Sequence, residues 1–210
     1  MSQTSNRLDA GPFNPGLLDP ANLRERFDGR RIFVGVTGGI AAYKTCTIVS
    51  RLAQAGAEVT VAMTDAATKF IGPITFQALS GRHVYTSCWE HVESKDPQHV
   101  SLATGLDAAL VAPCTMACLG RLAGGVPEDV VTLILSAVDM RKTPVLLAPA
   151  MNAQMWAQPA TRRNVRQLTE DGFHFVGPGE GWQACRHVGA GRMSEPEQIV
   201  AALCEHLASR

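Results

Sequence analysis

A pair of glycines stands where one apolar pattern gives way to another. A short apolar run typical of a buried strand comes first, at Ile32, Phe33, Val34 and Val36. Thr37-Gly38-Gly39 follows directly, and apolar residues then recur at helical spacing, which predicts a helix beginning near Gly39. This order of strand, glycine turn and helix directs backbone N–H groups and the positive end of a helix dipole toward an anion. The turn therefore predicts a phosphate site.

The sequence lacks two common phosphate-binding motifs, which narrows the kind of phosphate ligand expected. Gly35, Gly38 and Gly39 do not form the G-x-G-x-x-G pattern of dinucleotide sites, and the chain has no G-x-x-x-x-G-K-[ST] loop. We therefore expect a single phosphate, as on a mononucleotide. The turn by itself leaves one alternative open, a tight strand-to-helix turn that binds nothing.

The six cysteines give no metal-ligand pattern; they are Cys46, Cys88, Cys114, Cys118, Cys185 and Cys204. Cys114-x-x-x-Cys118 lacks partner ligands at zinc spacing, so no metal site is expected. The spacing is also no disulfide framework, and it indicates a reducing, cytoplasmic location.

The composition excludes several classes of protein. The chain has 210 residues and is 46% hydrophobic, which suits a single domain with a full core. Lys+Arg and Asp+Glu both number 19, so no nucleic-acid partner is expected. No apolar run reaches the roughly 18 residues of a membrane span, and the N-terminus lacks the apolar segment of a signal peptide. We therefore expect no membrane association.

The elements that must position the glycine turn follow from the pattern of the whole chain. Residues 1–29 are rich in glycine and proline and are predicted to form an extended arm before a domain at 30–210. Strand patterns then alternate with helix patterns, which predicts an α/β fold with a doubly wound parallel sheet, Rossmann-like or flavodoxin-like, in a single domain. Residues 81–97 are predicted as an irregular connection and 177–193 as a glycine-rich loop.

Ligands of such sheets bind outside the carboxyl ends of the strands. Four predicted strands end at 37–39, 63–64, 112–115 and 148–152. We expect these four stretches to converge on one crevice.

Six separated motifs resemble those of the flavin-dependent cysteine decarboxylases, a family that includes phosphopantothenoylcysteine decarboxylase and decarboxylases of C-terminal peptide cysteines. They occur in the family's order from about residue 31 to the end of the chain. The motifs are Gly38-Gly39-Ile40-Ala41-Ala42-Tyr43-Lys44, Met63-Thr64-x-x-Ala67-x-x-Phe70-Ile71, His99-Val100-x-Leu102, Ala112-Pro113-x-Thr115, Pro149-Ala150-Met151-Asn152-x-x-Met155-Trp156, and Gln183-Ala184-Cys185 with Gly189-x-Gly191-Arg192-Met193.

The resemblance implies an FMN cofactor held at the end of the sheet, which agrees with the phosphate site predicted from the glycine turn. The residues that it implies around FMN are Gly38, Gly39, Ile40, Ala41, Thr64, Phe70, Pro113, Thr115, Met116, Ala117, Cys118 and Ala150.

The resemblance also implies that His99 is catalytic. By itself, a histidine at the edge of a loop is more often structural, but an imidazole can serve as an acid or a base near neutral pH. In the implied reaction, oxidation of the cysteine Cα–Cβ–S unit to a thioaldehyde turns the carboxylate into a good leaving group.

Asn152 is implied to hold the substrate carboxylate, together with substrate contacts from Met155, Arg192 and Met193. An amide suits a carboxylate that must leave as neutral CO2, because an arginine would hold it more strongly. Asn152 could instead cap the following helix, and Met155 could equally be a core or subunit-contact residue.

Cys185 lies in the glycine-rich loop, which could close as a lid. In phosphopantothenoylcysteine decarboxylases the matching cysteine helps to reduce an enethiol intermediate. An ordinary buried cysteine is the alternative.

Two departures from the family pattern bear on the substrate: Ala117 replaces a common Asn or Asp, and Arg186 follows Cys185 in place of glycine. The synthetase domain often fused to bacterial members is also absent from the 210 residues. By a narrow margin we expect oxidative decarboxylation of the C-terminal cysteine of a ribosomal precursor peptide to an aminoenethiol, as in aminovinyl-cysteine formation. The alternative, which Cys185 favours, is a phosphopantothenoylcysteine decarboxylase of coenzyme A biosynthesis that gives 4′-phosphopantetheine. A flavin-binding regulatory subunit is a lesser alternative.

The resemblance further implies a homotrimer or a dodecamer of trimers, with FMN near a subunit interface. His99 of one chain is then expected to serve the flavin held by another.

Overall fold

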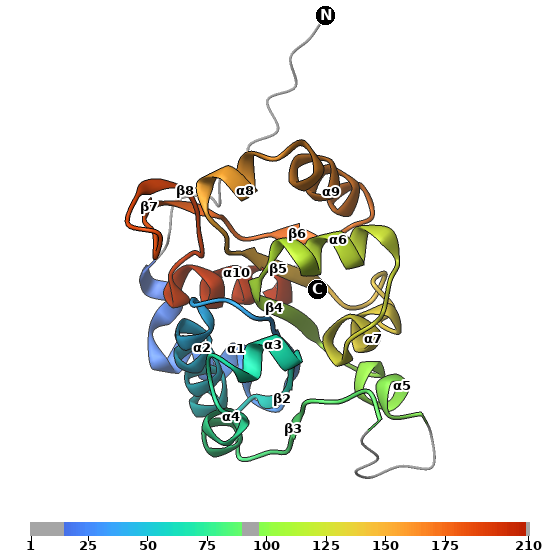
Figure 1. The fold of residues 1–210 in the computed structure, drawn as a ribbon. Helices are drawn as coiled ribbons and strands as arrows, with labels where there is room; N and C mark the ends of the chain where they lie inside the picture. The colour runs from blue at the N-terminus through green and yellow to red at the C-terminus, as the bar shows by residue number, and fades with distance from the viewer. Residues whose placement is uncertain (1–14, 90–96, 209–210) are drawn as a thin grey trace, which may run out of the picture.

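A six-stranded parallel sheet forms the centre of the molecule. The computed structural model describes residues 15–89 and 97–208. The strand order is β3-β2-β1-β4-β5-β6 (Figure 1). The chain winds outward in both directions from β1 and β4, which pair side by side, so the predicted doubly wound α/β fold is confirmed. The strands are β1 (Arg31–Val36), β2 (Glu58–Met63), β3 (Val84–Tyr85), β4 (Ala108–Cys114), β5 (Val145–Pro149) and β6 (His174–Phe175).

Helices cover both faces of the sheet because its strands are apolar on both sides. Along β1, Val34 packs into a core cluster on one face and Phe33 into a cluster on the other, as alternation of side chains along a strand requires. The first face carries α1 (Pro20–Phe27), α2 (Ala42–Gln54), α4 (Pro73–Ser80) and α10 (Pro196–Ala208). The second carries α5 (Gln98–Ala103), α6 (Met116–Gly124), α7 (Val130–Ser136) and α9 (Pro159–Glu170). The short elements are η1 (Pro15–Leu18), α3 (Asp65–Thr68) and α8 (Ala153–Ala157).

The predicted extended arm is wrong for the part of residues 1–29 that the structure describes. Pro20–Phe27 forms α1, and its Leu23 and Phe27 side chains are buried in the core. The helix begins where Asp19 caps it and Pro20 takes its first position, so the proline here favours the start of a helix and not an extended chain. The boundary expected at residue 30 therefore divides a packed unit. Residues 1–14 lie outside the described part of the chain.

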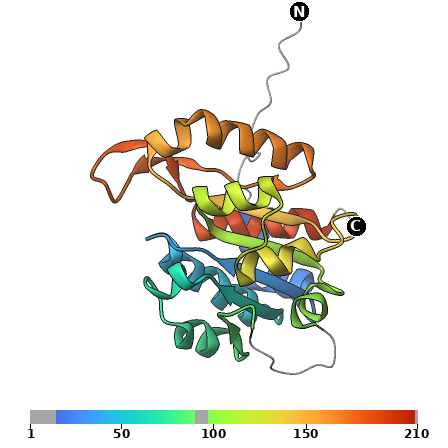
Figure 2. The same ribbon diagram turned by 45° about the vertical axis from the view of Figure 1, so that its right-hand side comes forward.

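The stretch predicted as a glycine-rich loop contains an antiparallel hairpin of β7 (Gly179–Trp182) and β8 (Val188–Arg192). It projects from the body of the molecule beside α8 (Figure 2). Glycine is disfavoured in strands and hides the usual alternation. Gly181 and Gly191, with φ of 156° and 122°, take backbone conformations that other residues rarely adopt.

No helix among the residues that the structure describes is both long and apolar enough to cross a bilayer.

Candidate functional site

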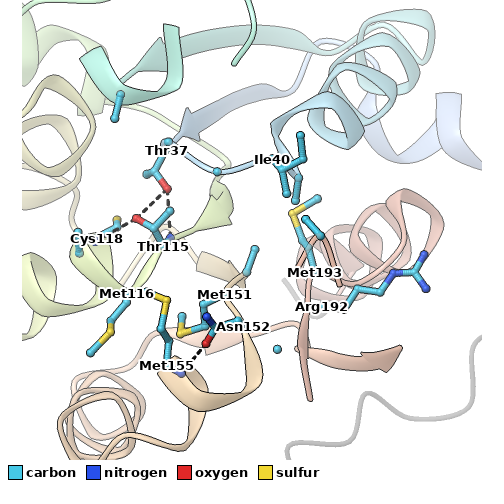
Figure 3. A pocket seen from close by; sticks show the side chains of 18 of the residues that line it. Thr37, Ile40, Thr115, Met116, Cys118, Met151, Asn152, Met155, Arg192 and Met193 are labelled. Atoms are coloured by element: carbon cyan, nitrogen blue, oxygen red, sulfur yellow. Dashed lines mark hydrogen bonds between the residues drawn. The ribbon is translucent and has the colours of Figure 1, made fainter. Parts of the chain in front are cut away.

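A cavity of about 1030 Å³ lies at the carboxyl edge of the sheet. Its walls include residues 37–39, Thr64, Thr115 and 150–152, so the four strand ends converge as predicted (Figure 3). Single-ligand pockets commonly measure up to about 1,000 Å³, so this cavity has room for a mononucleotide-sized cofactor with part of a substrate.

The glycine turn is fixed by a buried hydroxyl. Thr37 Oγ1 donates to the carbonyl of Pro113 at 2.6 Å. It also accepts from the backbone N–H of Thr115 at 3.1 Å (Figure 3). These bonds join the end of β1 to the end of β4, next to the start of α2. The two strand ends therefore act as one rigid rim of the cavity.

The turn can take a ligand close to its backbone. A Cβ on Gly38 would lie 2.4 Å from Ala66 Cβ, so the chain there is in direct contact with α3. A Cβ on Gly39 would meet nothing nearer than 3.7 Å, which leaves that position open. Helix α2 begins after Ala41 with no side chain capping it. An open backbone and an uncapped helix start suit the phosphate of FMN.

Two threonines of the cavity cap the helices that begin there. Thr64 Oγ1 accepts from the backbone N–H of Ala67 at 3.2 Å, and Thr115 Oγ1 accepts from that of Cys118 at 3.4 Å. Met116, Ala117, Cys118 and Ala150 complete this wall. Together with residues 38–41 they form the predicted cofactor wall, except for two positions. Phe70 is half exposed and does not line the cavity, and Pro113 contributes only through its carbonyl bond to Thr37.

Asn152 caps a helix and also lines the cavity. Its Oδ1 accepts from the backbone N–H of Met155 at 2.8 Å and so caps α8 (Figure 3). The side chain also lines the cavity, with Met116, Met151 and Met155 nearby. With its oxygen in the cap, the Nδ2 group is the part of the amide suited to donate to a ligand carboxylate.

The hairpin supplies the outer wall. Cys185 is exposed and lines the cavity, and its Sγ lies 3.6 Å from Gln183 Oε1. Arg192 also lines the cavity, but its Nη2 lies 2.6 Å from Glu195 Oε1. A ligand anion must therefore compete with Glu195 for this guanidinium.

Beneath the hairpin, Lys44 and Met193 form a buried contact. Met193 is 2% exposed and Lys44 is 7% exposed. The Nζ of Lys44 lies 3.0 Å from Glu195 and 3.3 Å from the Met193 carbonyl, so this buried charge has a partner.

His99 does not join the others. It lies on α5 and lines a small separate hollow with Cys88, Leu102 and Val130. Within one chain, the cavity with the implied cofactor and substrate residues is formed without the implied catalytic histidine.

The cavity also includes charged residues that the sequence did not indicate. Arg121 and Asp129 form an ion pair of 3.1 Å at the rim, and Asp129 also caps α7. Asp129 ahead of an apolar helix with Thr132 three residues on is a capping-box signal that could have located the rim. Gln183 lines the cavity from the hairpin, and the sequence indicated it only as part of the Gln183-Ala184-Cys185 motif, with no role of its own.

The buried thiol at the end of β4 stays protonated. Burial raises the pKa of the Cys114 thiol well above its ordinary value, and the neighbouring Cys118 side chain raises it further. Among the described residues, no group of three His, Cys, Asp or Glu side chains is placed to hold a metal ion.

Comparison with known proteins points to one family. The flavoprotein family matches residues 20–208. The coenzyme A biosynthesis bifunctional protein CoaBC of Bacillus subtilis is 43% identical over 181 residues, which cover 86% of this chain and 44% of that protein. The chain thus spans less than half the length of this relative.

Two solved structures share the fold. A mutant PPC decarboxylase complexed with pantothenoylaminoethenethiol is 28% identical with a TM-score of 0.75, over 83% of this chain and 96% of that one. The FMN-dependent cysteine decarboxylase SpaF is 29% identical with a TM-score of 0.72, over 85% and 97%.

Proposed function

The chain belongs to the flavoprotein family of FMN-dependent cysteine decarboxylases, and we propose that it decarboxylates phosphopantothenoylcysteine to 4′-phosphopantetheine. The main support for this substrate is that Cys185 and Asn152 line the same cavity. A thiol there can donate the proton needed to saturate the product, a step that a purely oxidative peptide decarboxylase does not need. The 43% identity to CoaBC supports the same choice. The comparisons therefore favour the coenzyme A reaction over the peptide reaction that the sequence narrowly suggested.

The cofactor wall fits FMN. Gly38, Gly39, Ile40 and Ala41 would hold the phosphate side, and the start of α6 with Ala150 would complete the wall. When bound, FMN supplies the redox chemistry, because it accepts two electrons from the Cα–Cβ–S unit and can return them.

The substrate wall favours loss of charge. The Nδ2 group of Asn152 orients the carboxylate by a neutral hydrogen bond. Met151 and Met155 place apolar surface beside it, where an unpaired negative charge is poorly solvated. Departure of neutral CO2 relieves that cost. An arginine in place of Asn152 would remove this advantage by pairing with the carboxylate.

His99 is supplied by a second subunit in this proposal. It lies outside the cavity of its own chain, while Ile40 and Tyr43, beside the glycine turn, are 60% and 56% exposed. Exposed apolar side chains around a site are typical of a protein interface. We expect a homotrimer or a dodecamer of trimers in which His99 reaches the neighbouring cavity and moves a proton on the substrate. A monomer in solution by light scattering would contradict this part.

Anaerobic mass spectrometry with flavin absorbance tests the substrate. We expect phosphopantothenoylcysteine to lose CO2 alone, with the flavin oxidised at the end of the turnover. A cysteine-terminated peptide that loses CO2 and two hydrogens while phosphopantothenoylcysteine stays unchanged would establish the peptide enzyme instead.

The same experiment addresses a regulatory role. A flavin-binding regulatory subunit would turn over neither substrate. A regulatory subunit would not need both His99 and Asn152. This chain contains both residues, which favours an enzyme.

A further inference from the structure

One amide inside the hairpin uses all of its hydrogen-bonding capacity. The Gln183 side chain is buried, with the residue 8% exposed. Its Nε2 donates to the carbonyls of Ala190 at 2.9 Å and Gly189 at 3.3 Å. Its Oε1 accepts from the backbone N–H of Ala153 at 3.1 Å and from the thiol of Cys185 at 3.6 Å. Two carbonyls on one side and two donors on the other allow only one orientation of the amide.

These four bonds connect the two segments that bear the substrate chemistry. Ala153 directly follows Asn152 and opens α8, whereas Cys185 lies in the turn between β7 and β8. The Oε1 atom of Gln183 is thus a shared acceptor for the Asn152 segment and for the Cys185 thiol. Of the hydrogen bonds found in the described residues, this is the one that reaches the Cys185 side chain.

The hairpin is docked against the Asn152 segment by more than this amide. The backbone N–H of Met151 donates to the carbonyl of Gly191 at 2.9 Å. A Cβ on Gly191 would lie 2.3 Å from the Met151 carbonyl, and one on Gly189 would lie 2.9 Å from Ala153 Cβ. The root of the hairpin is therefore held by β8. Backbone bonds from Gln183 N–H to the His187 carbonyl and from Arg186 N–H to the Gln183 carbonyl close the turn that bears Cys185, and the Gln183 side chain adds the contact that orients the Cys185 thiol.

We propose that Gln183 is a positioning residue that sets the Cys185 thiol relative to the substrate held by Asn152, and so determines how much product is released saturated. This rests on the proposed function. In the reductive step the Cys185 S–H bond breaks and its proton forms a C–H bond on the enethiol. The sulfur keeps the electron pair and later regains a proton from water. The two electrons and the other hydrogen that saturation requires return from the reduced flavin.

A purely structural role makes a different prediction. If Gln183 only satisfied buried carbonyls, its loss would lower the stability of the hairpin and slow all steps equally. If Gln183 positions Cys185, its loss lowers the rate of only the step that needs the Cys185 proton, because the Asn152 segment keeps its cap and its bond to Gly191.

The test compares the wild type with Q183L, which keeps nearly the same side-chain volume and loses the side-chain hydrogen bonds of Gln183, while the backbone bonds of residue 183 stay. Q154L, at an exposed position of α8, is the matched control. Each is given phosphopantothenoylcysteine without oxygen, and released CO2, saturated thiol and enethiol are measured. We expect Q183L to release CO2 within threefold of the wild-type rate, with at least a fivefold larger share of enethiol. Q154L should match the wild type.

An unchanged product ratio in Q183L, or an equal fall in CO2 release and saturated thiol, would overturn the proposal. Alkylation of Cys185 by iodoacetamide, followed by peptide mass spectrometry, needs no substrate. We expect at least threefold faster alkylation in Q183L, with Cys46 as the internal reference. An unchanged rate would also overturn it. If the wild type releases no CO2 but Cys185 reacts faster in Q183L, the proposed substrate fails while the positioning contact stands.

Discussion

Replacing Gly38 with alanine tests the contact between the glycine turn and α3. The new Cβ would lie 2.4 Å from Ala66 Cβ and 2.9 Å from the Ala66 carbonyl carbon, well inside the normal contact distance. Because one of the two groups is backbone, the turn or α3 must move. Overpacking of this kind costs about 1–3 kcal/mol. In a chain of this size each kcal/mol lowers the Tm by about 2–4 °C.

The same displacement moves the start of α2, where FMN is expected to bind. If the bound form bears an additional cost of about half this size, roughly 0.5–1.5 kcal/mol, FMN binding weakens about 2- to 13-fold. We therefore expect Gly38→Ala to lower the Tm of the apo-protein by roughly 2–12 °C. We also expect FMN to bind about 2- to 13-fold more weakly in a titration of flavin fluorescence.

Gly39→Ala is the matched control for the packing term. Its Cβ would meet nothing closer than Thr115 Cγ2 at 3.7 Å, an ordinary contact. The apo-protein of Gly39→Ala should therefore have the same Tm as the wild type, whatever effect the methyl group has on FMN binding. If Gly38→Ala also melted and bound FMN like the wild type, the argument from this contact would be wrong.

Three further perturbations test other parts of the molecule. Thr37→Val leaves the buried Pro113 carbonyl without its donor and should cost about 1–3 kcal/mol in urea unfolding, whereas Thr37→Ser should cost much less. The pKa of Glu197 lies below its ordinary 4.5, first because its own backbone N–H donates to the carboxylate and then because Arg51 does. That contribution to stability is present above the ordinary value and is lost as pH falls through the lowered one. The Tm of Glu197→Gln should therefore fall less steeply than that of the wild type between about pH 5 and pH 3, and parallel curves would contradict the shift. His99→Asn should keep the yellow colour and lose at least about 100-fold in turnover, and unchanged turnover would remove His99 from the mechanism.

The centre of the fold follows from the sequence because its signals are local. The apolar run of β1 and the helical spacing after Gly39 predict the two elements that form the rim of the cavity. The rule that ligands bind at strand ends then brings Thr64, Thr115 and Asn152 together, as the structure confirms. Thr64 and Thr115 directly follow buried strands, and Asn152 lies three residues after the end of one, so their positions need little tertiary information.

The remaining features depend on contacts that no local pattern contains. Leu23 and Phe27 reach the core only because α1 packs against α10, which lies at the other end of the chain. The glycines of the hairpin mask its strand pattern. The hydrogen bonds of Gln183 form only because β8 brings Gly189 and Ala190 beside it, so its role cannot be predicted from the local sequence. The distance of His99 from the cavity likewise depends on the packing of α5 against α7.

The position of His99 on α5, away from the cavity of its own chain, has a consequence for mixtures of subunits. In the proposed oligomer a site takes Asn152 from one chain and His99 from the next, and it is complete whenever those two residues are intact, whichever chains carry them. Chains inactivated at His99 and chains inactivated at Asn152 would therefore restore one another on co-assembly. When the two kinds of inactive chain mix at random in equal amounts, about one site in four has both residues intact. Genetic complementation between two inactive alleles would thus be a direct result of where a single helix lies.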